Sequence, residues 1–240
     1  MAQYNTINTA GVGARSAAID AGLRAHMNKV YGLMSVAMLI TAAVAWAVGT
    51  NATMLETIFT GPIRWVVMFL PLVMVFAFGA LINRLSVAGA QLFFYTFAAA
   101  MGLSLAWIFA VFTGASITST FLVTAIAFAG LSLYGYTTKR DLSGFGTFLV
   151  MGLIGLLVAS IVNIFLASSA LQFAISVIGV LIFAGLTAFD TQNIKTTYIA
   201  HAQAGDQEWL GKAAIMGALN LYLDFINLFM FLLQFLGNRE

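Results

Sequence analysis

No cysteine occurs among the 240 residues, only two residues are proline, and 8% are charged. The absence of cysteine excludes disulfides, iron–sulfur clusters held by thiolates and thiol catalysis. Soluble globular proteins average about 25% charged and about 45–50% apolar residues. Here 62% of the residues are hydrophobic, so the composition indicates an integral membrane protein. The net charge of +2 is too small to suggest nucleic acid as a partner.

Long apolar runs fill most of the chain. A transmembrane helix needs about 20 apolar residues, with a range of about 17–25. The runs do not alternate as barrel strands do, so we expect an all-α integral membrane protein with a single seven-helix transmembrane domain over residues 26–240. Residues 1–25 are small and polar, and we expect a mobile cytoplasmic tail there. The predicted spans lie near residues 29–49, 64–82, 87–111, 116–137, 146–166, 171–194 and 213–236.

Positive side chains near the span ends predict how the chain crosses the bilayer, because Lys and Arg are enriched on the cytoplasmic side. If the N-terminus is cytoplasmic, eight of the ten Lys and Arg residues fall on that side. We therefore expect a cytoplasmic N-terminus and a C-terminus on the far side. The far side holds only Arg64 and Arg239, and the cytoplasmic side holds Arg15, Arg24, Lys29, Arg84, Lys139, Arg140, Lys195 and Lys212.

Two acidic residues lie inside predicted spans, where ionisation is most costly. They are Asp190 in the sixth span and Asp224 in the seventh. A charged side chain at a helix centre costs about 2.5–3.5 kcal/mol on insertion scales, and such residues usually face the bundle interior and mark an ion pathway or proton site. At 1.5 Å per residue, Asp190 should lie about 7 Å and Asp224 about 16 Å from the cytoplasmic ends of their spans. Arg84 ends the second span on the same side, so one positive and two negative groups could converge there.

Further polar residues share a helical face with these two acids, at spacings of three and four residues. We expect the two polar faces to turn toward each other or toward water. They comprise Asn220, Asp224 and Asn227 in the seventh span, and Thr187, Asp190 and Asn193 in the sixth.

Two carboxylates that share a site of low dielectric constant cannot both ionise freely. A proton between them would seal the site, whereas Arg84 would favour the ionised, repelling form, so the pair predicts a pH sensor. Ionised oxygens suit a hard cation, and calcium takes about 6–8 oxygen ligands. Asp190 and Asp224, with amide oxygens of Asn220 or Asn227 and water, would make a weak calcium site. The alternative is a structural clamp, although polar pairs between membrane helices average only about 0.6 kcal/mol.

The stretch LYLDFINLF at residues 221–229 resembles the transmembrane Bax-inhibitor-motif family, in particular its bacterial branch. FYTF at 94–97, KRDL at 139–142 and FDTQNIK at 189–195 occur in the expected order. The likeness covers roughly residues 20–237. It implies a seven-helix bundle with a central seventh helix, and an activity as a pH-dependent calcium leak.

The resemblance also implies roles for individual residues and for partners. The paired aspartates of the family match Asp190 and Asp224, and its gating arginine is similar to Arg84. Bacterial relatives include proteins that bind and restrain a membrane-anchored protease, so a membrane adaptor acting through residues 1–25 is the alternative function. The bacterial likeness favours an inner membrane, with the lipid bilayer, calcium ions and protons as further partners.

Motifs of the common enzyme classes are missing from the sequence. It has no hydrolase elbow, phosphate loop, HExxH or dinucleotide fingerprint. His26 and His201 have no cysteine or spaced carboxylate partner, which makes zinc improbable. An intramembrane aspartyl protease also uses two aspartates on neighbouring helices, but the residues preceding Asp190 and Asp224 do not match its motifs. We therefore expect no enzyme and no cofactor.

Overall fold

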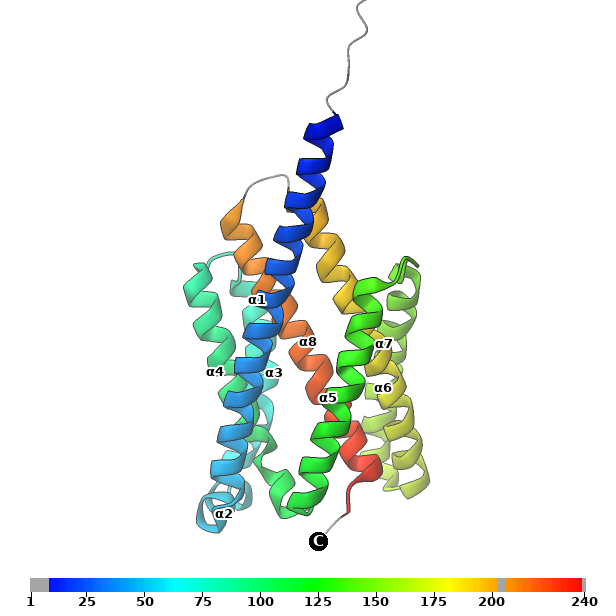
Figure 1. Ribbon diagram of the computed structural model, residues 1–240. Helices are drawn as coiled ribbons and strands as arrows, with labels where there is room; N and C mark the ends of the chain where they lie inside the picture. The colour runs from blue at the N-terminus through cyan, green and yellow to red at the C-terminus, as the bar shows by residue number, and fades with distance from the viewer. Residues whose placement is uncertain (1–8, 203–205, 239–240) are drawn as a thin grey trace, which may run out of the picture.

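The computed structural model describes residues 9–202 and 206–238. Seven helical segments in these residues are long and apolar enough to cross a membrane, so the prediction of an all-α, seven-span protein is confirmed (Figure 1). Six spans are single helices, and the third joins α4 to the short 3-10 helix η1. The elements are α1 (Thr9–Gly49), α2 (Ala52–Thr60), α3 (Ile63–Leu81), α4 (Val87–Leu105), η1 (Ala106–Ala110), α5 (Gly114–Thr137), α6 (Ser143–Leu166), α7 (Ser169–His201) and α8 (Gln207–Leu236).

Helix α8 lies at the centre of the bundle, as the resemblance implies, and packs against α1, α4, α5 and α7 (Figure 1). A larger share of α8 is buried than of any other span. Small residues allow this close packing, since Gly211 lies against Val87 of α4 and Gly217 against Ile194 of α7. The apolar core of the protein is therefore built around α8, whereas α3 and α6 expose most of their apolar surface, as lipid-facing helices do.

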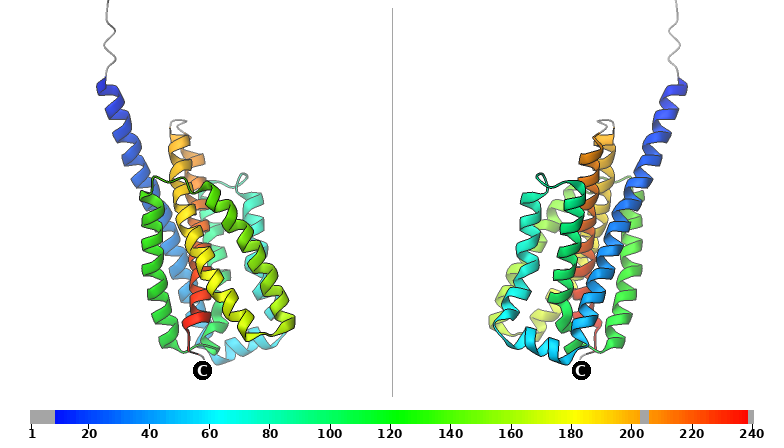
Figure 2. Two further views of the ribbon diagram at one scale, coloured as in Figure 1. Left: turned by 90° about the vertical axis from the view of Figure 1, so that its right-hand side faces the viewer. Right: turned by 90° about the vertical axis from the view of Figure 1, so that its left-hand side faces the viewer.

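The connections between spans alternate between the two ends of the bundle. The start of α1, the α3–α4 turn, the α5–α6 loop, the end of α7 and the start of α8 lie at one end (Figures 1 and 2). Helix α2, the α6–α7 turn and the end of α8 lie at the other. Because cytoplasmic charges are expected on the α3–α4 and α5–α6 connections, we call the first end the inner end and the second the outer end.

Side-chain caps satisfy backbone N–H groups where several of the helices begin. Ser86 Oγ accepts from Gly89 N at 3.1 Å to start α4, and Thr113 Oγ1 accepts from Ser116 N at 3.2 Å to start α5. Asp206 Oδ1 accepts from Trp209 N at 2.9 Å to start α8. These Ser, Thr and Asp residues fix where each span begins.

Several helix boundaries predicted from apolar length were wrong. Helix α1 begins at Thr9, within the segment 1–25 expected as a tail, and residues 1–8 lie outside the described residues. Helix α2 occupies the loop expected at 49–62, where Asn51 caps its first turn. Helices α7 and α8 together take up most of the loop expected at 195–212. Each of these helical segments is polar or amphipathic in sequence. Apolar length alone therefore does not predict that they are helical.

Candidate functional site

The carboxyl groups of Asp190 on α7 and Asp224 on α8 lie within hydrogen-bonding reach of each other. Asp224 is only 4% exposed, and Asp190 is partly buried. The Oδ2 atom of Asp224 is buried and has no hydrogen-bond donor among the described residues. Two carboxyl groups can hydrogen bond only when one of them carries a proton, so the geometry fits a pair that shares a single proton.

No Lys, Arg or His side chain among the described residues forms an ion pair with either aspartate. The ion pair of Lys212 with Glu208, at 2.9 Å, is the only one in the described part of the chain. Two unit charges about 4 Å apart repel by roughly 4 kcal/mol at an effective dielectric constant of 20. That repulsion is several times the thermal energy, so full ionisation of the pair would push α7 and α8 apart.

The depths predicted for the two aspartates, counted in residues from the cytoplasmic ends of their spans, were wrong. Asp190 lies about 16 Å before the end of α7, and Asp224 about 26 Å after the start of α8, at 1.5 Å per residue. Both values exceed the predicted ones because α7 and α8 extend further toward the inner end. Helix α8 also crosses the bundle obliquely (Figure 1), so distance along it overstates depth in the bilayer.

The residues expected to line a polar seam divide into two groups. Thr187 Oγ1 donates to Phe183 O at 2.8 Å, and Asn227 Nδ2 donates to Leu223 O at 2.8 Å, so both bond to their own helices. Asn193 and Asn220 instead line one small cavity of about 260 Å³ at the inner end. The aspartates do not line this cavity, although they lie one helical turn from those two amides.

Arg84 does not contact the aspartate pair in this structure. It lies exposed in the turn after α3, where its backbone N donates to Leu81 O at 2.8 Å. Its neighbour Asn83 lines the inner-end cavity together with Asn193 and Asn220. The arginine is therefore near the cavity mouth, and a latch between Arg84 and the aspartates stays a prediction.

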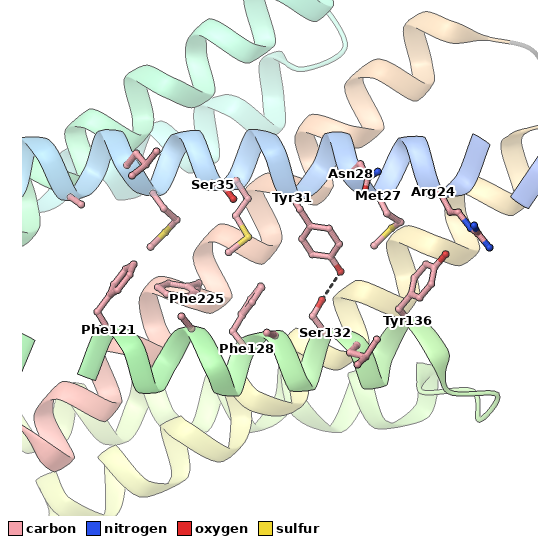
Figure 3. Close-up of a pocket in the computed structure, with 17 residues that line it drawn as sticks. Arg24, Met27, Asn28, Tyr31, Ser35, Phe121, Phe128, Ser132, Tyr136 and Phe225 are labelled. Carbon is pink, nitrogen blue, oxygen red and sulfur yellow. Dashed lines mark hydrogen bonds between the residues drawn. The ribbon is translucent and has the colours of Figure 1, made fainter. Parts of the chain in front are cut away.

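A chain of hydroxyl groups links three helices beside the pair, and sequence reasoning did not predict it. Tyr31 Oη lies 2.5 Å from Ser132 Oγ (Figure 3). Ser132 Oγ in turn lies 2.9 Å from Thr191 Oγ1. Thr191 directly follows Asp190, so the chain runs from α1 through α5 to the helix that carries one acid. Ser and Thr are common in membrane spans, which is why their pattern alone does not mark a network.

The predicted weak calcium site has no further acidic ligand in the structure. In residues 9–202 and 206–238, no cluster of three or more His, Asp or Glu side chains could hold a metal ion. Asp190 and Asp224 alone supply charged oxygens, which suits brief contact with a passing cation better than storage. Calcium at this pair stays a prediction.

Comparisons with known proteins agree on one group of sequences. Residues 23–240 match the family described as "Inhibitor of apoptosis-promoting Bax1". The chain is 48% identical over 221 residues to "Inner membrane protein YbhL" of Escherichia coli K12, which covers 92% of this chain and 94% of YbhL. It is 46% identical over 232 residues to an uncharacterized protein of Caulobacter vibrioides, and 44% identical over 221 residues to one of Rickettsia prowazekii, each covering 92% of both chains.

Proposed function

Because this chain belongs to the Bax inhibitor family of membrane proteins, we propose that it is a pH-sensitive cation leak channel with calcium as the permeant ion. The observation that carries the proposal is the pair of carboxyl groups of Asp190 and Asp224, which lie in hydrogen-bonding reach of each other on two packed helices. YbhL is named as an inner membrane protein, which supports a bacterial inner membrane as the location.

The shared proton keeps the channel closed. With one proton, the pair is a hydrogen-bonded link between α7 and α8 that carries a single negative charge. When the proton leaves, the hydrogen bond is lost and two adjacent negative charges repel by several kcal/mol. This repulsion pushes α7 and α8 apart. Ion flux therefore rises as the pH rises through the range in which the pair loses its proton, and falls on acidification.

The open path runs from the inner-end cavity to the aspartates. Asn193 and Asn220 line that cavity and lie one turn from Asp190 and Asp224. A calcium ion entering there meets these amide oxygens beside the ammonium group of Lys212, which also lines the cavity, and then the ionised carboxylates, which are hard oxygen ligands. Few ligands and two negative charges favour weak binding, as passage requires.

Asp141 does not act as the sensor in this proposal. It is an exposed acid in the α5–α6 loop, and its Oδ1 accepts from Ser143 N at 2.9 Å. Hydrogen bonds from the Ser143 side chain, and then from its backbone, hold the pKa of Asp141 below its ordinary value. It is already ionised at the acidic end of the proposed range, so it contributes no change of charge across that range.

Calcium flux into liposomes that contain the purified protein tests the proposal. We expect the wild-type flux to rise with pH, and Asp224→Asn to remove that dependence because a single carboxylate has no like charge to repel. Glu56→Gln, at an exposed acid of α2 at the outer end, is the control and should behave as the wild type does. Flux equal to that of empty liposomes at every pH, or an unchanged pH dependence in Asp224→Asn, would refute it.

One observation favours a membrane adaptor as a second candidate function. The first turns of α1 extend past the neighbouring helices at the inner end (Figure 2). A projecting helix suits recognition of a partner such as a membrane-anchored protease. Deleting residues 1–18 should then abolish co-purification of that partner while leaving calcium flux intact, and retention of the partner would reject the idea.

A further inference from the structure

A groove of about 940 Å³ separates α1 from α5 (Figure 3). One wall is a stripe along α1 that includes Arg24, Asn28 and Tyr31, and the other is a stripe along α5. Phe225 of α8 forms part of its floor. The spacing of the α1 residues by three and four places them on one helical face. Since both helices span the membrane, the groove opens toward lipid.

Polarity changes along the length of this groove. Its inner end carries the guanidinium of Arg24, the amide of Asn28 and the phenol of Tyr136, whereas the opposite end is formed by Phe121 and methionine and alanine side chains (Figure 3). The Tyr31–Ser132 hydrogen bond crosses the floor between the two parts. A ligand that matches this gradient has a polar head and an apolar tail.

The charge of the groove selects the sign of that head. Arg24 is its only charged lining residue, and none of the lining residues is acidic. Arg24 is exposed, and it forms no ion pair with any acid that the structure describes. An unpaired guanidinium binds a phosphate oxygen through charge-assisted, often bidentate, hydrogen bonds.

The groove is somewhat longer than one leaflet of a bilayer is thick. From Arg24 to Ala42, both of which line it, α1 rises about 27 Å at 1.5 Å per residue. Half of a bilayer with its headgroups is about 20–22 Å thick. A phospholipid with its phosphate at Arg24 would therefore extend an acyl chain past Tyr31 to the level of Phe121.

We propose that the groove between α1 and α5 is a binding site for one anionic phospholipid of the leaflet at the inner end. The phosphate lies at Arg24, within reach of Asn28 and Tyr136, and one acyl chain lies between the two helices against Phe225. Neither Asp190 nor Asp224 lines the groove. The site is thus distinct from the proton site and is tested separately.

Native mass spectrometry of the purified protein, after incubation in detergent with phosphatidylethanolamine in excess over phosphatidylglycerol, measures which lipid is retained. We expect one phosphatidylglycerol per chain, enriched over its share of the mixture. Arg24→Gln should weaken its retention by about tenfold, the value of one charge-assisted hydrogen bond. Arg140→Gln, an exposed arginine at the same end that does not line the groove, should leave it unchanged.

A second variant tests the apolar half of the site. Ala129 is exposed and lines the groove, so Ala129→Trp fills the space for the acyl chain and should reduce retention of both lipids without unfolding the protein, as thermal unfolding would verify. Arg24→Gln should keep the wild-type pH dependence of calcium flux. A bound lipid composition equal to that of the mixture, equal retention in Arg24→Gln and Arg140→Gln, or a protein dimer that Ala129→Trp dissociates would each overturn the proposal.

Discussion

Two buried polar side chains of the LYLDFINLF stretch, Tyr222 and Asp224, contact different helices. Tyr222 is fully buried, and its hydroxyl lies 2.7 Å from Thr41 Oγ1 of α1. Its ring lies edge-on to Phe94, with the ring centroids 5.7 Å apart. Asp224 instead meets Asp190 of α7. Residues two apart face opposite sides of a helix, so this stretch requires a helix that is covered on both sides, as α8 is.

The hydrogen bond of Tyr222 should make a small and measurable contribution to stability. Thr41 Oγ1 also lies 2.8 Å from Ala98 O, so Tyr222 is the donor to Thr41. We expect Tyr222→Phe to lower the free energy of unfolding by about 0.6–1 kcal/mol. Tyr222→Ala should cost about 3–5 kcal/mol, because it also leaves a cavity.

Denaturant unfolding in mild detergent measures both changes. Tyr134→Phe is the control, since Tyr134 is 49% exposed on α5, and it should change the free energy of unfolding by less than about 0.5 kcal/mol. If Tyr222→Phe were tolerated as well as Tyr134→Phe, the hydrogen bond to Thr41 would contribute nothing to stability.

At the scale of helices, the contact between α5 and α7 holds Asp190 in position. A Cβ atom at Gly135 of α5 would collide with the backbone of Ala188 on α7. One turn away, Ser132 and Thr191 join the same two helices through their hydroxyls at 2.9 Å. The position of α7 near Asp190 therefore depends on a residue of α5 that has no side chain.

Substitution of Gly135 should disturb this contact, and Gly130 provides a matched comparison on the same helix. Gly135→Ala overpacks a backbone contact and should destabilise the protein by about 1–3 kcal/mol. A Cβ at Gly130 meets no atom within 4 Å, so Gly130→Ala should be neutral or stabilising by up to about 1 kcal/mol. Thermal unfolding of both variants checks this, and equal melting temperatures would contradict the close approach of α5 and α7.

The sequence predicted the seven spans well, because apolar length is a property of each segment alone. It missed α2 and the polar ends of α1, α7 and α8, since a helix that leaves the bilayer loses its apolar signature. The two acids of the candidate site were predictable because an ionised acid in the membrane interior has a high free energy. Their meeting point was not, because the relative register and tilt of two helices depend on contacts such as Gly217 with Ile194.

At the scale of the whole molecule, all connections expected in the cytoplasm lie at one end of the bundle (Figures 1 and 2). This arrangement fits the charge bias of the sequence, in which Lys and Arg cluster at that end. Which end faces the cytoplasm stays a prediction that depends on the positive-inside rule. The absence of native cysteine makes it easy to test, since every introduced cysteine is unique.

Labelling of single cysteines with a membrane-impermeant maleimide reports the orientation. Thr53 in α2 and Gln207 at the start of α8 are both exposed and lie at opposite ends. We expect Thr53→Cys to react in spheroplasts and Gln207→Cys to react only after the membrane is permeabilised. The cysteine-free parent provides the background, and the reverse pattern would show that the chain is inserted the other way.

Infrared spectroscopy of the reconstituted protein tests most directly whether Asp190 and Asp224 share one proton that closes the channel. At a pH where calcium flux is closed, we predict a carboxylic acid C=O band equivalent to one group per chain. It should disappear over the same pH range in which flux appears, and be absent from a variant in which both residues are Asn. A closed wild-type channel without that band, or a band of equal size in the double variant, would contradict the account.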